Sequence, residues 1–195
     1  MKQALYIDCC IRGEQSCTRR LAEAFFAALP KGWQVTAVPL MEEDLRPLNG
    51  ETLASRDALL LAGRTDAPRF DRARQLAEAD LVVIAAPFWD MSFPALLKVY
   101  IENVSVEGIT FRTTAEGLKG LSRAERCVFL TTRGGAYPAG DPMEQAVPYL
   151  RAIQKFFGMG ALSCVAADGL DLDGADAAAL VTDAQARAAA LARTL

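Results

Sequence analysis

Six consecutive apolar residues, 81–86, constrain the fold of this chain more than any other stretch. An unbroken apolar run cannot alternate between core and solvent, so it predicts a strand that is buried on both faces of a parallel sheet. Pro87 cannot donate a hydrogen bond to a sheet, which ends the strand. Phe88 and Trp89 are therefore predicted to lie at the carboxyl edge of the sheet.

Strands and helices alternate along the rest of the chain. Ser92 can cap a helix and Pro94 suits its first turn, which predicts a helix over 93–104. Pro148 is predicted to kink or interrupt a helix that starts at Asp141. The other predicted helices cover 16–29, 51–62, 66–79 and about 180–191, and the other predicted strands cover 4–8, 33–38, 127–131 and 161–166. This alternation predicts an α/β fold with a five-stranded parallel sheet, in the order 2-1-3-4-5.

The composition narrows the class of protein. A chain of 195 residues, 52% hydrophobic and 23% charged, fits one globular domain, 1–195. No apolar run approaches the ~18 residues of a membrane helix, and the N-terminus lacks the pattern of a secretory signal. The net charge of −3 is too small to favour nucleic acid or an anionic membrane. We therefore expect a cytoplasmic protein without nucleic-acid or membrane partners.

The absence of histidine is the main chemical constraint. It removes Ser-His and Cys-His nucleophiles and argues against catalytic zinc, so we expect no metal site. The five cysteines include no C-x-x-C pair, which favours reduced thiols. Cys127 and Cys164 are predicted to be core residues, whereas Cys9 and Cys10 are interpreted as small loop residues rather than a reactive vicinal pair. The chemistry therefore needs a cofactor, a carboxylate, a thiol, or an Arg or Lys side chain.

The loop after the first strand predicts an anion site. Ser16, Cys17 and Thr18 open a helix there, so backbone N–H groups and the positive helix end meet at one place. Three arginines lie close by in the sequence, namely Arg12, Arg19 and Arg20. The loop lacks both the dinucleotide fingerprint and the nucleoside triphosphate loop. An ordinary Ser-capped helix with solvated arginines is the alternative.

A pair of glycines follows the fourth strand. In Thr132-Arg133-Gly134-Gly135 the glycines allow either a close approach to the backbone or a turn with positive φ, and a plain loop explains them equally well. The order 2-1-3-4-5 makes the first, third and fourth strands neighbours. Their loops are therefore predicted to converge at one edge, where open α/β sheets bind ligands. The segment 108–114 is interpreted as a short strand or flap.

Four segments resemble the FMN-dependent NADH:quinone oxidoreductase and azoreductase family. They are Ser16-Cys17-Thr18, 87–91 with Leu96-Leu97-Lys98, 108–112, and the Gly-Gly loop. The resemblance implies a flavodoxin-like three-layer α/β fold, bound FMN, NADH or NADPH as co-substrate, a small-molecule electron acceptor and a homodimer. It implies phosphate contacts from Cys10, Ser16, Cys17 and Thr18, ring contacts from Pro87, Phe88, Trp89, Asp90 and Met91, and ring-edge contacts from Thr132, Arg133, Gly134 and Gly135. Trp89, Phe111 and Thr113 would line the substrate site, and no side chain is assigned as catalytic, because the flavin carries the chemistry.

The chain departs from the better-known azoreductases at three places. They have Ser where Cys10 stands, Met-Tyr-Asn-Phe where this chain has Phe88-Trp89-Asp90-Met91, and Tyr where Thr113 stands. The carboxylate of Asp90 would disfavour the anionic reduced ring unless a hydrogen bond or Arg133 compensates it. Thr113 would widen the substrate site. These changes suggest a divergent branch.

The leading hypothesis is an oxidoreductase that passes hydride from NADH or NADPH through flavin N5 to a quinone or an azo compound, in a two-step exchange. The alternative is a flavodoxin-type electron carrier, or a flavin-binding sensor, without reductase activity of its own. Carriers tend to surround the flavin with acidic residues for docking. These loops instead contain arginines, which favour an anionic nucleotide substrate: Arg12, Arg19, Arg20 and Arg133.

Overall fold

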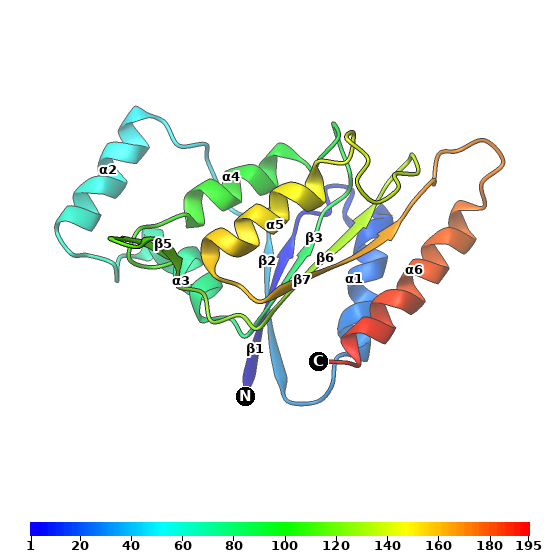
Figure 1. The fold of residues 1–195 in the computed structure, drawn as a ribbon, viewed down its shortest axis with the longest axis horizontal. Coiled ribbons are helices and arrows are strands. Elements are labelled where there is room, and N and C mark those ends of the chain that lie inside the picture. The colour runs from blue at the N-terminus through cyan, green and yellow to red at the C-terminus, as the bar shows by residue number, and fades with distance from the viewer.

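The computed structural model describes all 195 residues, and a parallel sheet of five strands forms its centre. The strands lie in the order β2-β1-β3-β6-β7 (Figure 1), which is the predicted order 2-1-3-4-5 when only the strands of this sheet are counted. Their bounds are Lys2–Asp8 (β1), Trp33–Pro39 (β2), Leu81–Ala85 (β3), Arg126–Thr132 (β6) and Ala161–Ala167 (β7). The predicted fold class and strand order are confirmed.

Helices cover both faces of the sheet and complete the three predicted layers (Figure 1). One face carries α1 (Cys17–Ala28) and α6 (Ala177–Ala192), and the other carries α3 (Asp71–Glu78), α4 (Ala95–Val104) and α5 (Ala146–Phe157). Successive residues of β3 alternate between the two cores. All five of its side chains are buried, which is why the sequence shows an unbroken apolar run.

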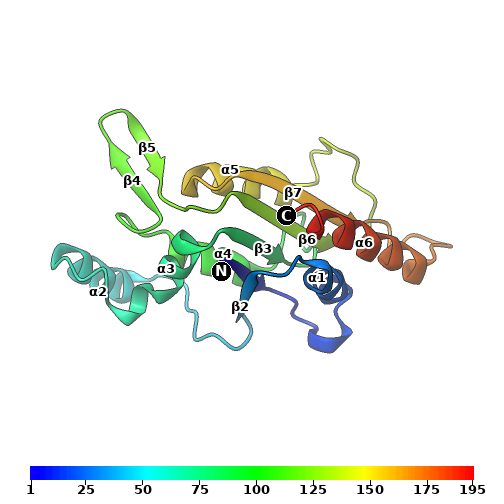
Figure 2. The same cartoon turned by 90° about the horizontal axis from the view of Figure 1, so that it is seen from below.

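Two elements stand away from this body (Figure 2). One is α2 (Gly50–Leu61), which begins with a capping box between Asn49 and Thr52 and has no buried residue. The other is the antiparallel hairpin of β4 (Phe111–Thr114) and β5 (Gly117–Gly120). The predicted flap is the first strand of this hairpin, and the second strand has no apolar alternation that would indicate it. None of the helices combines the length and the apolar character needed to cross a membrane.

Several predicted helix boundaries are wrong for local reasons. Ser92 does not cap α4, because its backbone closes a tight turn with Trp89, and the helix begins only at Ala95. α5 begins at Ala146, later than predicted, and Pro148 lies in its first turn, where a missing N–H has no intrahelical partner to lose. The predicted helix 66–79 is a short 3₁₀ turn followed by α3.

The two cysteines predicted to lie in the core differ in burial. Cys127 on β6 is buried as predicted, and burial raises the pKa of its thiol to about 12. Cys164 on β7 is exposed, which contradicts the prediction. β7 is an edge strand, and much of its length is only partly covered. An apolar run at the edge of a sheet therefore does not ensure burial.

Candidate functional site

A cavity of about 310 Å³ lies at the carboxyl edge of the sheet. The loops after β1, β3, β6 and β7 form it, together with the first residue of α6. The three loops predicted to converge therefore do so, and a fourth joins them. The lining residues are Arg12, Gln15, Ser16, Cys17, Thr18, Pro87, Phe88, Trp89, Thr132, Arg133, Gly134, Leu170, Asp171 and Ala177.

Most of the predicted cofactor residues line this cavity. The predicted residues that are absent from the lining are Cys10, Asp90, Met91, Gly135, Phe111 and Thr113. The lining residues that the sequence analysis missed are Gln15, Leu170, Asp171 and Ala177. Three of the missed residues follow β7, where the sequence shows no ligand motif. The available signal was the strand order, which places the β7 loop next to the Gly-Gly loop.

The first loop ends in the N-terminus of α1, which points into the cavity. Ser16 is the N-cap, and its hydroxyl accepts a hydrogen bond from the Arg19 N–H at 3.3 Å. The first N–H groups of the helix, those of Cys17 and Thr18, have no acceptor within the helix. The Thr18 hydroxyl is 2.6 Å from that of Thr132, so it links this loop to the end of β6. Such a helix end suits an anion.

Arg19, a predicted anion ligand, instead pairs with carboxylates. Its Nη2 donates to Asp8 at 2.9 Å, and its Nη1 donates to Glu14 at 3.2 Å. Burial by itself would raise the pKa of Asp8, but hydrogen bonds from Arg19 and Cys10 outweigh it and hold that pKa below its ordinary value. Asp8 therefore keeps its negative charge and Arg19 is not free. Of the three arginines near this loop, only Arg12 lines the cavity.

Cys10 also lies outside the cavity. Its thiol is buried and lies 3.8 Å from the carbonyl oxygen of Ala85. Burial, with the nearby charge of Asp8, raises the pKa of Cys10, and burial raises that of Cys9 to about 12. Both are therefore thiols rather than reactive thiolates at neutral pH, which agrees with their interpretation as small loop residues.

The loop after β3 contains a strained turn. The backbones of Trp89 and Ser92 exchange two hydrogen bonds, at 3.2 and 2.8 Å. The residues between them, Asp90 and Met91, have φ of 48° and 63°, in the left-handed region that normally favours Asn and Gly. The Gln145 N–H donates to the carbonyl of Met91 at 2.9 Å and holds the turn from outside. This turn presents Trp89, which is 39% exposed, at the cavity rim.

The Gly-Gly loop, residues 132–135, is packed tightly against another loop. Neither Gly134 nor Gly135 has a positive φ, so the turn alternative is wrong. The carbonyl oxygens of residues 133–135 accept hydrogen bonds from N–H groups of residues 169–171, at 3.0 to 3.1 Å. A Cβ on Gly134 would overlap the carboxylate of Asp171. The N–H groups of both glycines donate to no protein atom, and Gly134 lines the cavity.

Arg133 is buried and already paired. Its side chain is 6% exposed, with Nη2 3.4 Å from Glu144 Oε1 and Nη1 3.3 Å from Asp168 Oδ1. Its guanidinium carbon lies 5.5 Å from the ring centroid of Phe88, whose other neighbour is Tyr137 at 4.8 Å. Like Arg19, Arg133 does not offer a free positive charge to an anionic ligand. These two arginines therefore do not support the prediction of an anionic nucleotide substrate.

The hairpin lies at the opposite edge of the sheet. Phe111 packs on Phe156 near the C-terminal end of α5, with ring centroids 4.6 Å apart. Gly120 adjoins Gly158, just before β7 begins. These contacts place the hairpin beside the amino ends of the strands. Within one chain, Phe111 and Thr113 therefore do not reach the cavity.

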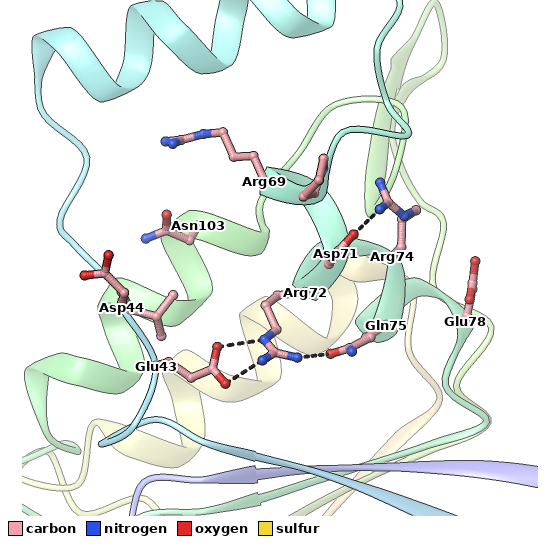
Figure 3. A pocket seen from close by; sticks show the side chains of 11 residues that line it. Glu43, Asp44, Arg69, Asp71, Arg72, Arg74, Gln75, Glu78 and Asn103 are labelled. Atoms are coloured by element: carbon pink, nitrogen blue, oxygen red, sulfur yellow. Dashed lines mark hydrogen bonds and ion pairs between the residues drawn. The ribbon is translucent and has the colours of Figure 1, made fainter.

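A larger cavity, of about 630 Å³, lies between residues 43–45, α3 and the end of α4 (Figure 3). Its charges are largely paired with one another: Arg72 binds Glu43 and Gln75, and Arg74 binds Asp71. It shares no residue with the cavity at the carboxyl edge and has only one hydrophobic lining residue. We do not assign it a ligand.

The donors of the carboxyl-edge cavity fit FMN. The N-terminus of α1 offers N–H groups and hydroxyls for a phosphate. The Gly134 N–H offers a donor to the edge of a heteroaromatic ring, and Phe88 and Trp89 offer flat faces. A planar ring that carries a phosphate tail matches this distribution.

Comparison with known proteins agrees with this fit. The flavodoxin-like fold family matches residues 2–192. A Clostridium perfringens protein named FMN-dependent NADH:quinone oxidoreductase is 36% identical over 199 residues, covering 99% of each chain. A Coprothermobacter proteolyticus protein of the same name is 35% identical, also covering 99% of each chain. An azoreductase from Bacillus anthracis str. Sterne has a TM-score of 0.88 at 26% identity over the whole of both chains. The chain therefore belongs to the flavodoxin-like family that includes the FMN-dependent NADH:quinone oxidoreductases.

Proposed function

We propose that this protein is an FMN-dependent oxidoreductase that passes hydride from NADH or NADPH to a quinone or a similar acceptor, azo compounds included. The observation that carries the proposal is one cavity with N–H donors at two ends and aromatic rings between them. Relatives that align with 99% of the chain are named for this activity. Bound FMN supplies the hydride chemistry through N5, and donor and acceptor would occupy the same place in turn.

The two ends of the cavity would hold the cofactor. The N–H groups of Cys17 and Thr18, with the hydroxyls of Ser16 and Thr18, would bind the phosphate. The Gly134 N–H would donate to the pyrimidine edge of the ring. Phe88 is fixed between Arg133 and Tyr137, so its face would exclude water from the ring without reorganising.

We further propose a homodimer in which the hairpin of a second copy covers the cavity. Two observations support it. Phe111 and Thr113, which the family resemblance assigns to substrate binding, lie at the opposite edge of their own sheet. α2 has no buried residue, so it is a helix that a partner could cover. Sedimentation of the purified protein should give a dimer, and Phe111→Ala should lower acceptor turnover; a monomer with full activity would contradict this arrangement.

The alternative of an electron carrier gains support because Arg19 and Arg133 are each paired with carboxylates. Asp171 lies at the cavity wall, and Asp90 projects from the adjoining turn, so the rim is more acidic than the sequence suggested. Acidic rims are typical of carriers that dock on basic partners. The deciding experiment is visible absorbance with anaerobic addition of NADH, NADPH and then a quinone. Bleaching by a nucleotide and recovery with quinone supports the oxidoreductase, and bleaching by dithionite alone supports the carrier or sensor.

Trp89 gives a sharper test of the substrate place. Because its ring lies at the rim of the cavity, Trp89→Ala should reduce quinone turnover about tenfold while FMN retention changes less than about twofold. Met143→Ala is the matched control, since Met143 is an exposed apolar residue, 52% exposed, outside the cavity. Equal loss of turnover and of FMN would contradict the assignment of Trp89.

A further inference from the structure

The ion cluster of Glu144, Arg133 and Asp168 separates two cavities. On one side is the carboxyl-edge cavity of about 310 Å³, and on the other is a cavity of about 540 Å³ bounded by residues 137–148, the start of α5 and the end of β7. Arg133 lines both cavities, whereas Glu144 and Asp168 line only the second. The two carboxylates therefore lie outside the proposed flavin site, next to Arg133, which lines it.

Two carboxylates lie 3.3 and 3.4 Å from the single guanidinium of Arg133 and offset its charge. Arg151 and Arg187 also line the second cavity, so the charges around that cavity as a whole are mixed. The carboxylate of Glu144 is also fixed by the start of α5, because its Oε1 accepts a hydrogen bond from the Val147 N–H at 3.1 Å. The side chains of Arg133 and Glu144 are 6% and 10% exposed, so water screens their charges poorly. The Asp168 side chain, at 37% exposed, is better screened.

This cluster lies next to the groups that would face the ring. Thr132 and Gly134 flank Arg133 in the chain and line the cavity, and Phe88 lies directly against the guanidinium. A lone buried arginine here would favour a ligand that gains negative charge. Two carboxylates within ion-pair distance offset that effect.

We propose that Glu144 and Asp168 are positioning residues that neutralise Arg133 and so weaken the binding of reduced FMN relative to that of oxidised FMN. The inference rests on the proposed function, because it concerns the same cofactor. Reduction places negative charge on the ring, and the two carboxylates offset the positive charge of Arg133 that would otherwise stabilise it. The consequence is a lower reduction potential than an unpaired arginine would give, which favours electron delivery to the acceptor.

The test measures the ratio of the dissociation constants of oxidised and reduced FMN. This ratio follows from the difference between the midpoint potentials of the bound and the free cofactor. Glu144→Gln keeps the acceptor for the Val147 N–H and removes one charge. It should shift the ratio about tenfold towards reduced FMN, which is about 30 mV for a two-electron couple. Asp168→Asn should shift it in the same direction by less, since Asp168 is more exposed. The double variant should shift the ratio by more than either single variant.

Two controls separate charge from structure. Asp168→Glu keeps the charge and should restore the wild-type ratio. Asp66→Asn removes a carboxylate from the exposed Arg64–Asp66 pair, which lines neither cavity, and should leave the ratio unchanged. Shifts no larger than that of Asp66→Asn would overturn the inference, as would an equal loss of affinity for both forms of FMN, which indicates a purely structural role. A wild-type protein that takes up no FMN would instead refute the proposed function itself.

Discussion

Two aspartates, one on each side of the cavity, pair with arginines and yet have pKa values displaced in opposite directions. Asp8, at the end of β1, lies 2.9 Å from Arg19, and its pKa is lowered. Asp168, after β7, lies 3.3 Å from Arg133, and burial raises its pKa although Arg133 and Arg187 act to lower it. The side chain of Asp168 is the more exposed of the two, at 37% against 7%. Exposure therefore does not explain the difference.

Hydrogen bonding explains it. Asp8 accepts hydrogen bonds from Arg19 and from the backbone N–H of Cys10, each at 2.9 Å. Oδ1 of Asp168 is buried and accepts none, and Arg133 is shared with Glu144. In this protein, the paired arginine brings the pKa below its ordinary value only at the carboxylate that also accepts hydrogen bonds.

Replacing each aspartate by asparagine should give the largest difference in stability between the two sites. Asp8→Asn should cost about 2 kcal/mol of unfolding free energy, because it removes a charge-assisted hydrogen bond in a buried pair. Asp168→Asn should stay within about 1 kcal/mol of wild type, since its pair is partly exposed and poorly aligned. Urea unfolding measures both, with Asp66→Asn, in the exposed Arg64–Asp66 pair, as the control. Equal losses for the two variants would break the comparison.

The pH dependence of stability should have opposite signs at the two sites. Folding lowers the pKa of Asp8, so its contribution is present above the unfolded pKa and is lost as the pH falls through the folded pKa. Folding raises the pKa of Asp168, so its contribution is lost as the pH rises from the unfolded pKa through the folded pKa. Urea unfolding at several pH values from about 3 to 6 should show that each asparagine variant removes its own slope. Identical profiles for the two variants would contradict the assignment.

The tight packing of the Gly-Gly loop can be tested by adding a Cβ atom at Gly134. Gly134→Ala should cost about 1 kcal/mol of stability and weaken FMN binding, because its Cβ overlaps the Asp171 carboxylate. Asp171→Ala in the same chain should recover most of both losses. Gly50→Ala is the control, since a Cβ there meets nothing and its φ is not positive. A full loss that Asp171→Ala does not relieve would show that the loop contact is not the cause.

The smallest effect is expected at Cys10. Cys10→Ser should change the dissociation constant of FMN by less than about twofold, because this side chain lies outside the cavity. Thr18→Val, which removes a hydroxyl inside the cavity, should weaken binding several-fold more. Fluorescence quenching of FMN on titration measures both constants. A large effect of Cys10→Ser would support the phosphate role that the family resemblance implies for this position.

Sequence patterns were sufficient for the sheet and for most of the cavity. The apolar run 81–86, closed by Pro87, identified the central strand, and the alternation of strands and helices gave the order that brings three loops together. The positions of Ser16 and Gly134 in the site could be predicted, because cap residues and glycines affect the conformation of the backbone next to them. These signals are local, so neighbouring residues along the chain carry them.

Tertiary structure alone decided which charges are free and which loops touch. Arg19 and Arg133 looked available in the sequence, but Asp8, Glu144 and Asp168 neutralise them once the strands are aligned. The 169–171 loop joins the site only because β7 pairs with β6. The sequence by itself determined the strand order and the residue types at the carboxyl edge. The electrostatic character of that edge was decided by the fold, because ion pairs form between residues that only packing brings within hydrogen-bond distance.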